Sequence, residues 1–280
     1  MMRRSTLAAA FLLPAALCAQ TRRDFSTSRQ LHGETRLTAR IEYGAGSLRM
    51  APATGGDLYR LVMSYDGDRY TPLSSFDAGN GSVRLGLAST GSGGLHIGSR
   101  RQLEQTAFVT LSPAVGLDLS LELGAVEADI ELGGLQLTDL RLTTGASRTT
   151  LRFSRPNAGR CARATLSGGA ADISILGLGN SRCRQVEFDG GVGKVLLDLT
   201  GTWPSDARVR VQMAVGALTL RLPRDLGIRL TLDRFLSSFP ASGWTRQGNA
   251  YLSPGYAHSA RHLDLALSST LGGIDVEWVN

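Results

Sequence analysis

A short unit that begins with glycine recurs along the sequence and constrains the fold more than any other feature. After each such Gly, the second, fourth and sixth positions are apolar or small, as in Gly124 with Val126, Ala128 and Ile130. The clearer copies begin at Gly124, Gly145, Gly169, Gly191, Gly216 and Gly272. The spacings between the first five are 21, 24, 22 and 25 residues. Alternation with a period of two is typical of strands that have one buried face.

Such a unit is too small to bury its apolar face alone, and stacked copies bury a continuous core. We therefore predict an all-β fold, a stacked-strand β-solenoid with Gly-anchored repeats of roughly 22 residues. The residue after the glycine is small or β-branched, as a tight corner requires: Ala125, Ala146, Ala170, Val192 and Ala217. An antiparallel β-sandwich, which also has many strands and glycine turns, is the alternative fold.

Charges alternate in sign at the third position of four successive copies. These residues are Glu127, Arg148, Asp172 and Lys194. If neighbouring copies stack in register, they form an outward ladder of opposite charges, and we expect Glu131 to face Arg152 in the same way. Each exposed pair contributes only tenths of a kcal/mol, so the ladder would mainly fix the register.

Two cysteines occupy the same place in adjacent copies, because Cys161 and Cys183 each precede an anchor glycine by 8 residues. Neighbouring strands lie about 4.8 Å apart, which suits the Cα separation of a disulfide. We predict a Cys161–Cys183 bridge in an oxidising compartment. Two free or buried thiols are the alternative.

The first residues are typical of a secretory signal peptide, which we place at 1–19. Arg3 and Arg4 precede an apolar run over 7–17, and Ala19 is a suitable cleavage residue. A lipoprotein attached through Cys18 is the alternative. Since no later stretch has the length of a transmembrane helix, we predict an exported protein of the periplasm or cell envelope, with no transmembrane segment in the mature chain.

The remaining chain divides into a first β section over 20–113 and a cleaner repeat region over 114–280. In the first section we expect a hairpin of 47–50 with 59–64. An aromatic cluster interrupts the repeats near the end of the chain: Phe235, Phe239, Trp244, Tyr251 and Tyr256. This cluster either caps the last repeat or contacts a partner. The outward Leu196, Leu199 and Leu236 either cover an open edge or pack on a second copy.

Charge and motif content exclude several classes of protein. The net charge is +6, but basic residues alternate with acidic ones, which indicates a solvated surface and no nucleic-acid partner. With 3 Cys and 4 His, a zinc-rich protein is excluded. His258 and His262 have only Asp264 nearby as a third ligand, so we predict no metal site and no cofactor. No nucleophile elbow or phosphate-binding loop is present.

The sequence resembles the LiaF-like, toast-rack family of bacterial envelope proteins. The resemblance rests on the repeated Leu-Gly-Ala units and on Ser242-Gly243-Trp244-Thr245-Arg246, Asn249-Ala250-Tyr251 and Leu271-Gly272-Gly273-Ile274-Asp275-Val276. The first section, with Tyr43-Gly44-Ala45-Gly46, is similar to the domain that precedes the rack. The resemblance implies a stacked β architecture and a non-catalytic envelope role. In some members it implies association with stress-sensing membrane kinases.

We therefore predict a non-catalytic scaffold or binding module whose partner is an envelope protein or polymer, and the resemblance implies a link to the envelope stress response. A carbohydrate-active enzyme on a parallel β-helix is one alternative. It would require acids on adjacent rungs that lack Arg partners. An adhesin-like surface protein is the other alternative.

Overall fold

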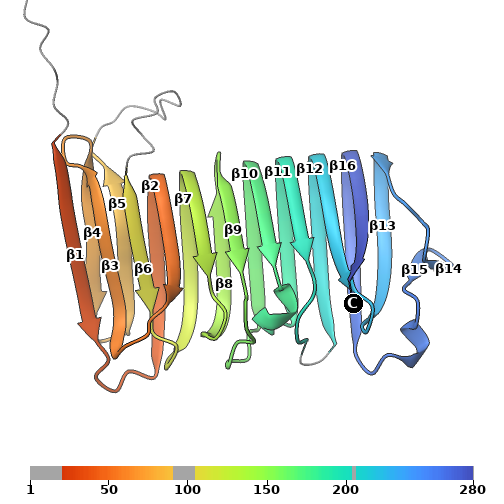
Figure 1. Cartoon of the computed structure of the whole chain (residues 1–280), viewed down its shortest axis with the longest axis horizontal. Coiled ribbons are helices and arrows are strands. Elements are labelled where there is room, and N and C mark those ends of the chain that lie inside the picture. The colour runs from red at the N-terminus through yellow and green to blue at the C-terminus, as the bar shows by residue number, and fades with distance from the viewer. Residues whose placement is uncertain (1–20, 91–104, 204–205, 280) are drawn as a thin grey trace, which may run out of the picture.

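The computed structural model describes residues 21–90, 105–203 and 206–279. The expected signal peptide and Cys18 lie outside these residues. The described chain is built almost entirely of strands, which stand side by side along the long axis of the molecule (Figure 1). Within the described ranges, no helix has the length and hydropathy needed to cross a membrane.

The strands join into one 16-stranded sheet. The first six are β1 (Arg22–Gln30), β2 (Arg36–Pro52), β3 (Asp57–Asp66), β4 (Tyr70–Asp77), β5 (Ser82–Ser89) and β6 (Thr106–Leu111). The next six are β7 (Gly116–Glu131), β8 (Gln136–Thr144), β9 (Arg148–Arg152), β10 (Arg163–Leu176), β11 (Gln185–Asp198) and β12 (Ala207–Pro223). The last four are β13 (Gly227–Ser238), β14 (Thr245–Gln247), β15 (Ala250–Leu252) and β16 (His262–Val279). Short 3-10 helices occur at Leu178–Ser181 (η2) and Tyr256–His258 (η3).

Pairing is parallel from β2 through β7, β8, β10, β11, β12 and β16 to β13. This parallel order differs from the antiparallel sandwich considered as the alternative. Antiparallel pairing is confined to the two ends, where β1 joins β3, β3 joins β6, β4 joins β5, and β15 joins β13 and β14. As a result, strands that carry successive glycine units, such as β10, β11 and β12, are neighbours in the sheet.

The hairpin expected in the first section is wrong. β6 lies between β2 and β3, so that Leu48 faces Ala107 on one side of β6 and Met63 faces the same Ala107 on the other. The glycine-rich turn after β2 does reverse the chain. Local turn residues, however, do not reveal that a strand from later in the chain inserts between the two arms.

Three of the long strands, β2, β7 and β10, have two halves that pair with different neighbours on one side. In β10, Arg163–Gly168 pairs with β8 and Asp172–Leu176 pairs with β9. Alternate side chains of both halves, such as Leu166 and Ile175, are buried in one hydrophobic cluster. The core therefore lies between the two halves. Burial of alternate residues is the consequence of the period-two pattern in the sequence.

Glycines stack where the strands bend between their halves. Gly193, Gly216 and Gly272 face one another on β11, β12 and β16, with φ of 144°, 142° and 139°. A Cβ on Gly272 would overlap the carbonyl oxygen of Gly216, so a larger residue does not fit.

The predicted alignment of the last copies is displaced by two residues. Gly216 faces Gly193 and not Gly191, and Ala217 faces Lys194 instead of Val192. A shift of two leaves the inward and outward alternation unchanged. The apolar pattern alone therefore could not distinguish the two registers.

Candidate functional site

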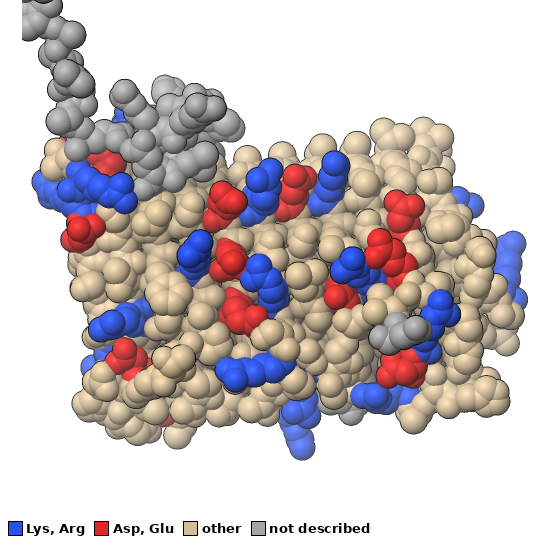
Figure 2. Space-filling model, in the orientation of Figure 1, with Lys and Arg blue, Asp and Glu red and all other residues tan. Residues whose placement is uncertain are grey.

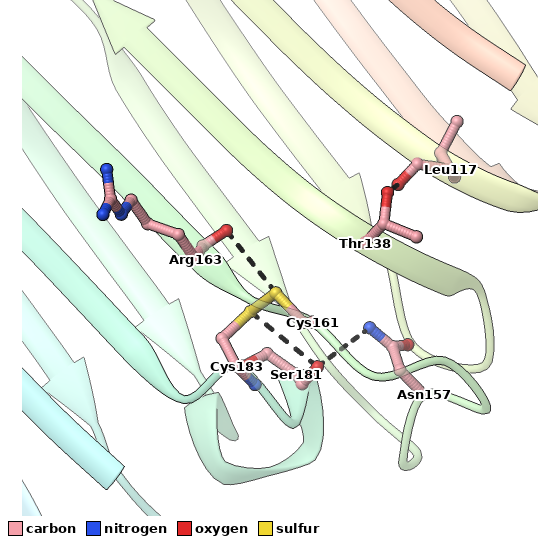
Figure 3. The surroundings of a disulfide bond; sticks show 7 residues. All are labelled: Leu117, Thr138, Asn157, Cys161, Arg163, Ser181 and Cys183. Atoms are coloured by element: carbon pink, nitrogen blue, oxygen red, sulfur yellow. Dashed lines mark hydrogen bonds between the residues drawn. A yellow bond between two sulfur atoms is a disulfide. The ribbon is translucent and has the colours of Figure 1, made fainter.

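The predicted disulfide is present between Cys161 and Cys183, whose Cα atoms are 4.2 Å apart. Figure 3 shows it linking the segments that precede β10 and β11. Both cysteines are buried, and the Ser181 hydroxyl accepts a hydrogen bond from the Cys183 N–H at 3.3 Å. Closing a loop of this size stabilises a fold by about 3 kcal/mol in the chain-entropy model. The bridge links the segments before β10 and β11, and neither of its buried cysteines is a free thiol.

The four charges of the predicted ladder lie in one row. Glu127 faces Arg148, and Asp172 faces Arg148 on one side and Lys194 on the other. Figure 2 shows acidic and basic side chains alternating along this part of the surface. All four lie in the described part of the chain, and none of them forms a close ion pair there. Their attraction is therefore of the weak, screened kind.

The expected pairing of Glu131 with Arg152 is wrong at the side-chain level, although the two residues face each other in the strands. Arg152 instead pairs diagonally with Asp129. The Glu131 carboxylate accepts hydrogen bonds from the N–H groups of Gly133 at 2.6 Å and Ser154 at 3.1 Å. Gly133 lies in the turn after β7 and Ser154 in the turn after β9, so neither N–H has a strand partner, and the Glu131 carboxylate satisfies both.

Three of the five predicted aromatic residues come together at the C-terminal end of the sheet. The ring of Phe239 lies 6.2 Å from Trp244 and 5.4 Å from Tyr251, and Trp244 lies 5.1 Å from Trp278. All four pack against the hydrophobic core. Trp278 was not among the predicted aromatic residues; it is the sixth residue after Gly272, one of the apolar positions of the last sequence unit. The signal that could have added it to the cluster is its spacing from Ile274 and Val276 on the same face.

The other two predicted aromatic residues lie apart from this cluster. Tyr256, in η3, packs on His262 at 4.7 Å. The Nε2 atom of His262 lies 3.1 Å from the Tyr256 carbonyl oxygen. Phe235 is 78% exposed, more than any other large apolar side chain in the described part of the chain. The five residues therefore do not form one surface.

A row of exposed apolar side chains runs across the bends of four adjacent strands. Val192 faces Val215, Val215 faces Leu271, and Leu271 faces Leu236. We call these four residues the apolar crest. Val192 is 57% exposed and Leu236 is 63% exposed.

Sequence reasoning found only Leu236 of the crest. Of the two other leucines expected to point outward, Leu199 is fully buried and Leu196 is half-buried. In three of the four strands, the crest residue immediately precedes a bend glycine. The bend turns its side chain outward, although the alternation along the strand alone would place it in the core. The position before a bend glycine could have predicted these exposed residues, but only with the knowledge that Gly216 pairs with Gly193.

Two acidic residues on adjacent strands test the enzyme alternative. Asp118 on β7 faces Asp139 on β8. Burial, and secondarily the charge of Asp139, raise the pKa of Asp118, while Arg141 opposes the shift. Arg141 and Arg163 line the same shallow pocket as the two acids. These acids therefore have Arg neighbours, unlike the cluster that a carbohydrate-active site would require. Elsewhere in the described chain, no group of three or more His, Cys, Asp or Glu residues is placed to hold a metal ion.

One large sheet, parallel through its middle and antiparallel at its two ends, defines an all-β class of protein. The chain matches the family model described as the N-terminal domain of toast_rack, DUF2154, over residues 19–176. It therefore belongs to this family. The match extends on both sides of the boundary expected at residue 113. A comparison with curated proteins finds no match.

Solved structures share this fold. A candidate cell adhesion protein from Clostridium sporogenes superposes with a TM-score of 0.50 at 14% sequence identity, covering 92% of this chain and 100% of that one. A candidate adhesin from Bacteroides fragilis gives a TM-score of 0.42 at 12% identity, covering 91% of this chain and 97% of the other. At these identities, the likeness concerns the fold alone.

Proposed function

We propose that the chain is an exported, non-catalytic β-solenoid of the cell envelope, which binds an envelope protein or polymer through its outer surface. Membership of the toast-rack family supports this role. The parallel pairing of successive copies supports a solenoid architecture, with Arg163 facing Gln185 and Gln185 facing Arg208. Its link to envelope stress signalling rests on the resemblance to toast-rack proteins.

Export is supported by two independent features of the chain. The leading segment 1–19 has the charge and apolar pattern of a signal peptide. The Cys161–Cys183 bridge is of the kind that persists in oxidising compartments. A mature chain that begins after Ala19 would be found in the periplasm or on the envelope, and N-terminal sequencing of the native protein tests this.

The apolar crest is the observation that carries the binding role. Soluble surfaces normally carry apolar side chains singly, and contiguous rows mark contact surfaces. Here four such side chains occupy directly opposite positions on four strands. The packed ring cluster of Phe239, Trp244 and Tyr251 has little free surface, and we infer that it caps the core instead of binding a partner.

The experiment compares envelope binding by crest and control variants. Purified protein is immobilised, and retention of cell-wall polymer and of solubilised envelope proteins is measured. We expect Val192→Lys with Val215→Lys to weaken retention roughly tenfold or more. Val62→Lys is the matched control, because Val62 is 42% exposed but lies on β3, away from the crest. Unchanged retention in the crest variant, or equal loss in the control, would contradict the proposal.

An adhesin-like surface protein is the second candidate function. The observation that favours it is the shared fold of the Clostridium sporogenes protein described above. The two functions separate in one comparison: an adhesin retains whole cells of another type, whereas an internal envelope module retains only material from its own envelope. Failure to retain intact cells, together with retention of the native polymer, would reject the adhesin.

A further inference from the structure

The sheet has several open edges, and most carry features that prevent pairing with another strand. The free edge strand β1 carries Arg22, Arg23 and Arg29. β4 contains Pro72, and β14 has only 3 residues. In β16, the residues beyond Gly273 have no partner on the β13 side, and their outward positions carry Asp275 and Glu277. Charge, proline and short length are the usual means of blocking strand addition.

The outer half of β13 differs from these edges, because it carries exposed Phe235 and Leu236 next to its two charged residues, Asp233 and Arg234. β15 pairs with β13 only over Arg229–Thr231. From Leu232 to Ser238, no strand of the described chain pairs with the side of β13 that faces away from β16. The open edge is therefore seven residues long and consists of these residues, Leu232-Asp-Arg-Phe-Leu-Ser-Ser238.

The hydrogen bonds at the start of β13 show which backbone groups face the open side. Gly227 donates its N–H to Arg261, toward β16, whereas Ile228 exchanges hydrogen bonds with Ser253 on the other side. Because successive residues of a strand alternate, Leu232 and Arg234 direct their backbone groups to the open edge. These groups have the spacing that an added strand requires.

The open edge also carries the most exposed apolar side chains of the described residues. Phe235 is 78% exposed and Leu236 is 63% exposed. The apolar crest ends at Leu236, so its row of side chains leads directly to this edge. The Arg234 side chain folds back to the Ser237 carbonyl at 3.0 Å, away from the apolar pair. An unpaired backbone beside exposed apolar side chains is the arrangement that strand addition uses.

We propose that two copies of this chain join through the open edge of β13, with β13 pairing antiparallel to β13 of the second copy about a two-fold axis. The opposite end of the sheet makes a poor partner, since it would place Arg22, Arg23 and Arg29 of β1 against Phe235 and Leu236. A two-fold axis instead places the apolar edge against itself and closes the assembly as a dimer. The two crests then form one continuous row. This inference is independent of the proposed binding function.

The first test measures the mass of the purified protein by sedimentation equilibrium over a wide range of concentration. We expect a monomer–dimer equilibrium in the wild type. Phe235→Lys and Leu236→Lys should each raise the dimer Kd roughly tenfold or more. Phe108→Lys should not, since Phe108 is 44% exposed but lies on β6, far along the sheet. A wild type that stays monomeric, or a dimer unaffected by both edge variants, would overturn the proposal.

The second test measures the symmetry of the pairing. In a Cys18→Ser background, Leu236→Cys lies near the two-fold axis and should form a disulfide-linked dimer on mild oxidation. Phe108→Cys should remain uncrosslinked. Stacking of β13 on β1 would give no crosslink with Leu236→Cys alone and would require Ser28→Cys as well. That pattern would replace the two-fold dimer with a head-to-tail assembly.

Loss of the dimer can be distinguished from loss of the proposed binding. The Val192→Lys and Val215→Lys variant changes the crest away from the edge, and it should keep the wild-type dimer Kd. The Phe235→Lys variant should lose the dimer. Circular dichroism and thermal unfolding confirm that each variant is folded before its mass is interpreted.

Discussion

At the residue scale, the bend glycines impose the strictest requirement on the sequence. Gly272 has φ of 139°, and a Cβ there would overlap the Gly216 carbonyl oxygen. We expect Gly272→Ala to lower the free energy of unfolding by about 1–3 kcal/mol, the usual cost of local backbone strain. Gly273→Ala is the control, since its Cβ would lie 3.7 Å from Ser238 Oγ, an ordinary contact. Urea unfolding compares the two, and equal losses would contradict the expectation.

A second residue-scale prediction concerns Glu42, which accepts two hydrogen bonds of 2.7 Å from Arg84. The bonded and charged guanidinium lowers the pKa of Glu42 below its ordinary value of 4.5. A lowered folded-state pKa means that the stabilisation is present above the unfolded value and is lost as pH falls through the folded value. We expect Glu42→Gln to cost up to about 1 kcal/mol at pH 7.

The difference between wild type and Glu42→Gln should shrink when unfolding is measured below the ordinary glutamate pKa. It should also shrink in high salt, because the guanidinium is half-exposed. A difference that stays constant between neutral and strongly acidic pH would show that Glu42 contributes through packing and not through its charge.

Counting residues from each glycine identified equivalent positions in successive sequence units. It did not identify every side-chain contact between them. Cys161 and Cys183 precede their glycines by equal distances, and that count gave the correct bridge. The same count placed Glu131 opposite Arg152, yet Arg152 turns to Asp129. Strand register fixes the Cα positions, whereas a long flexible side chain selects among neighbours within its reach.

At the element scale, the charge row on β7, β9, β10 and β11 tests whether electrostatics help to set the register. Asp172→Lys would place three like charges in line, because Asp172 faces both Arg148 and Lys194. We expect a loss of about 0.5–1 kcal/mol in unfolding free energy, larger at low salt. Adding Lys194→Glu should restore about half of it, because one of the two facing pairs of like charges then becomes a pair of opposite charges. A loss that this charge reversal does not rescue would indicate a packing role for Asp172.

Strand positions followed from the period of two, but strand partners did not. The alternation of apolar and polar residues identified β7, β10 and β16, because alternate side chains of these strands are buried in the core. It could not show that β6 inserts between β2 and β3. It also could not show that β13 stops at Ser238, which faces Gly273, about two thirds of the way along β16. Both facts depend on pairing between distant segments, and local patterning carries no information about that pairing.

At the scale of the whole molecule, the two ends of the sheet differ in how they meet solvent. The N-terminal end carries Arg side chains and Pro72 on its free strands. The C-terminal end has an aromatic cluster over the core and an open apolar edge beside it. The sequence predicted either a cap or a partner contact for the aromatic segment, and the structure divides the segment into packed and exposed residues. Phe239, Trp244 and Tyr251 pack inward, whereas Phe235 points to solvent.

The last prediction follows from the stacked arrangement, in which each strand contacts mainly its neighbours. Trp244 packs against Phe239 and Trp278 and closes one end of the core. We expect Trp244→Ala to lower the local opening free energy of β13, β15 and β16 by about 2–3 kcal/mol. Amide hydrogen exchange should then speed up in these strands, while β2 and β7 keep their protection.

Phe235→Ala is the matched control for this measurement, because it removes an aromatic ring that is exposed and outside the cluster. It should leave exchange in β16 unchanged at a protein concentration low enough to keep the chain monomeric. Faster exchange throughout the sheet in Trp244→Ala would mean that the molecule opens as one cooperative unit. In that case, the aromatic cluster would stabilise the whole fold and not only its end, and the sheet would unfold as one cooperative unit.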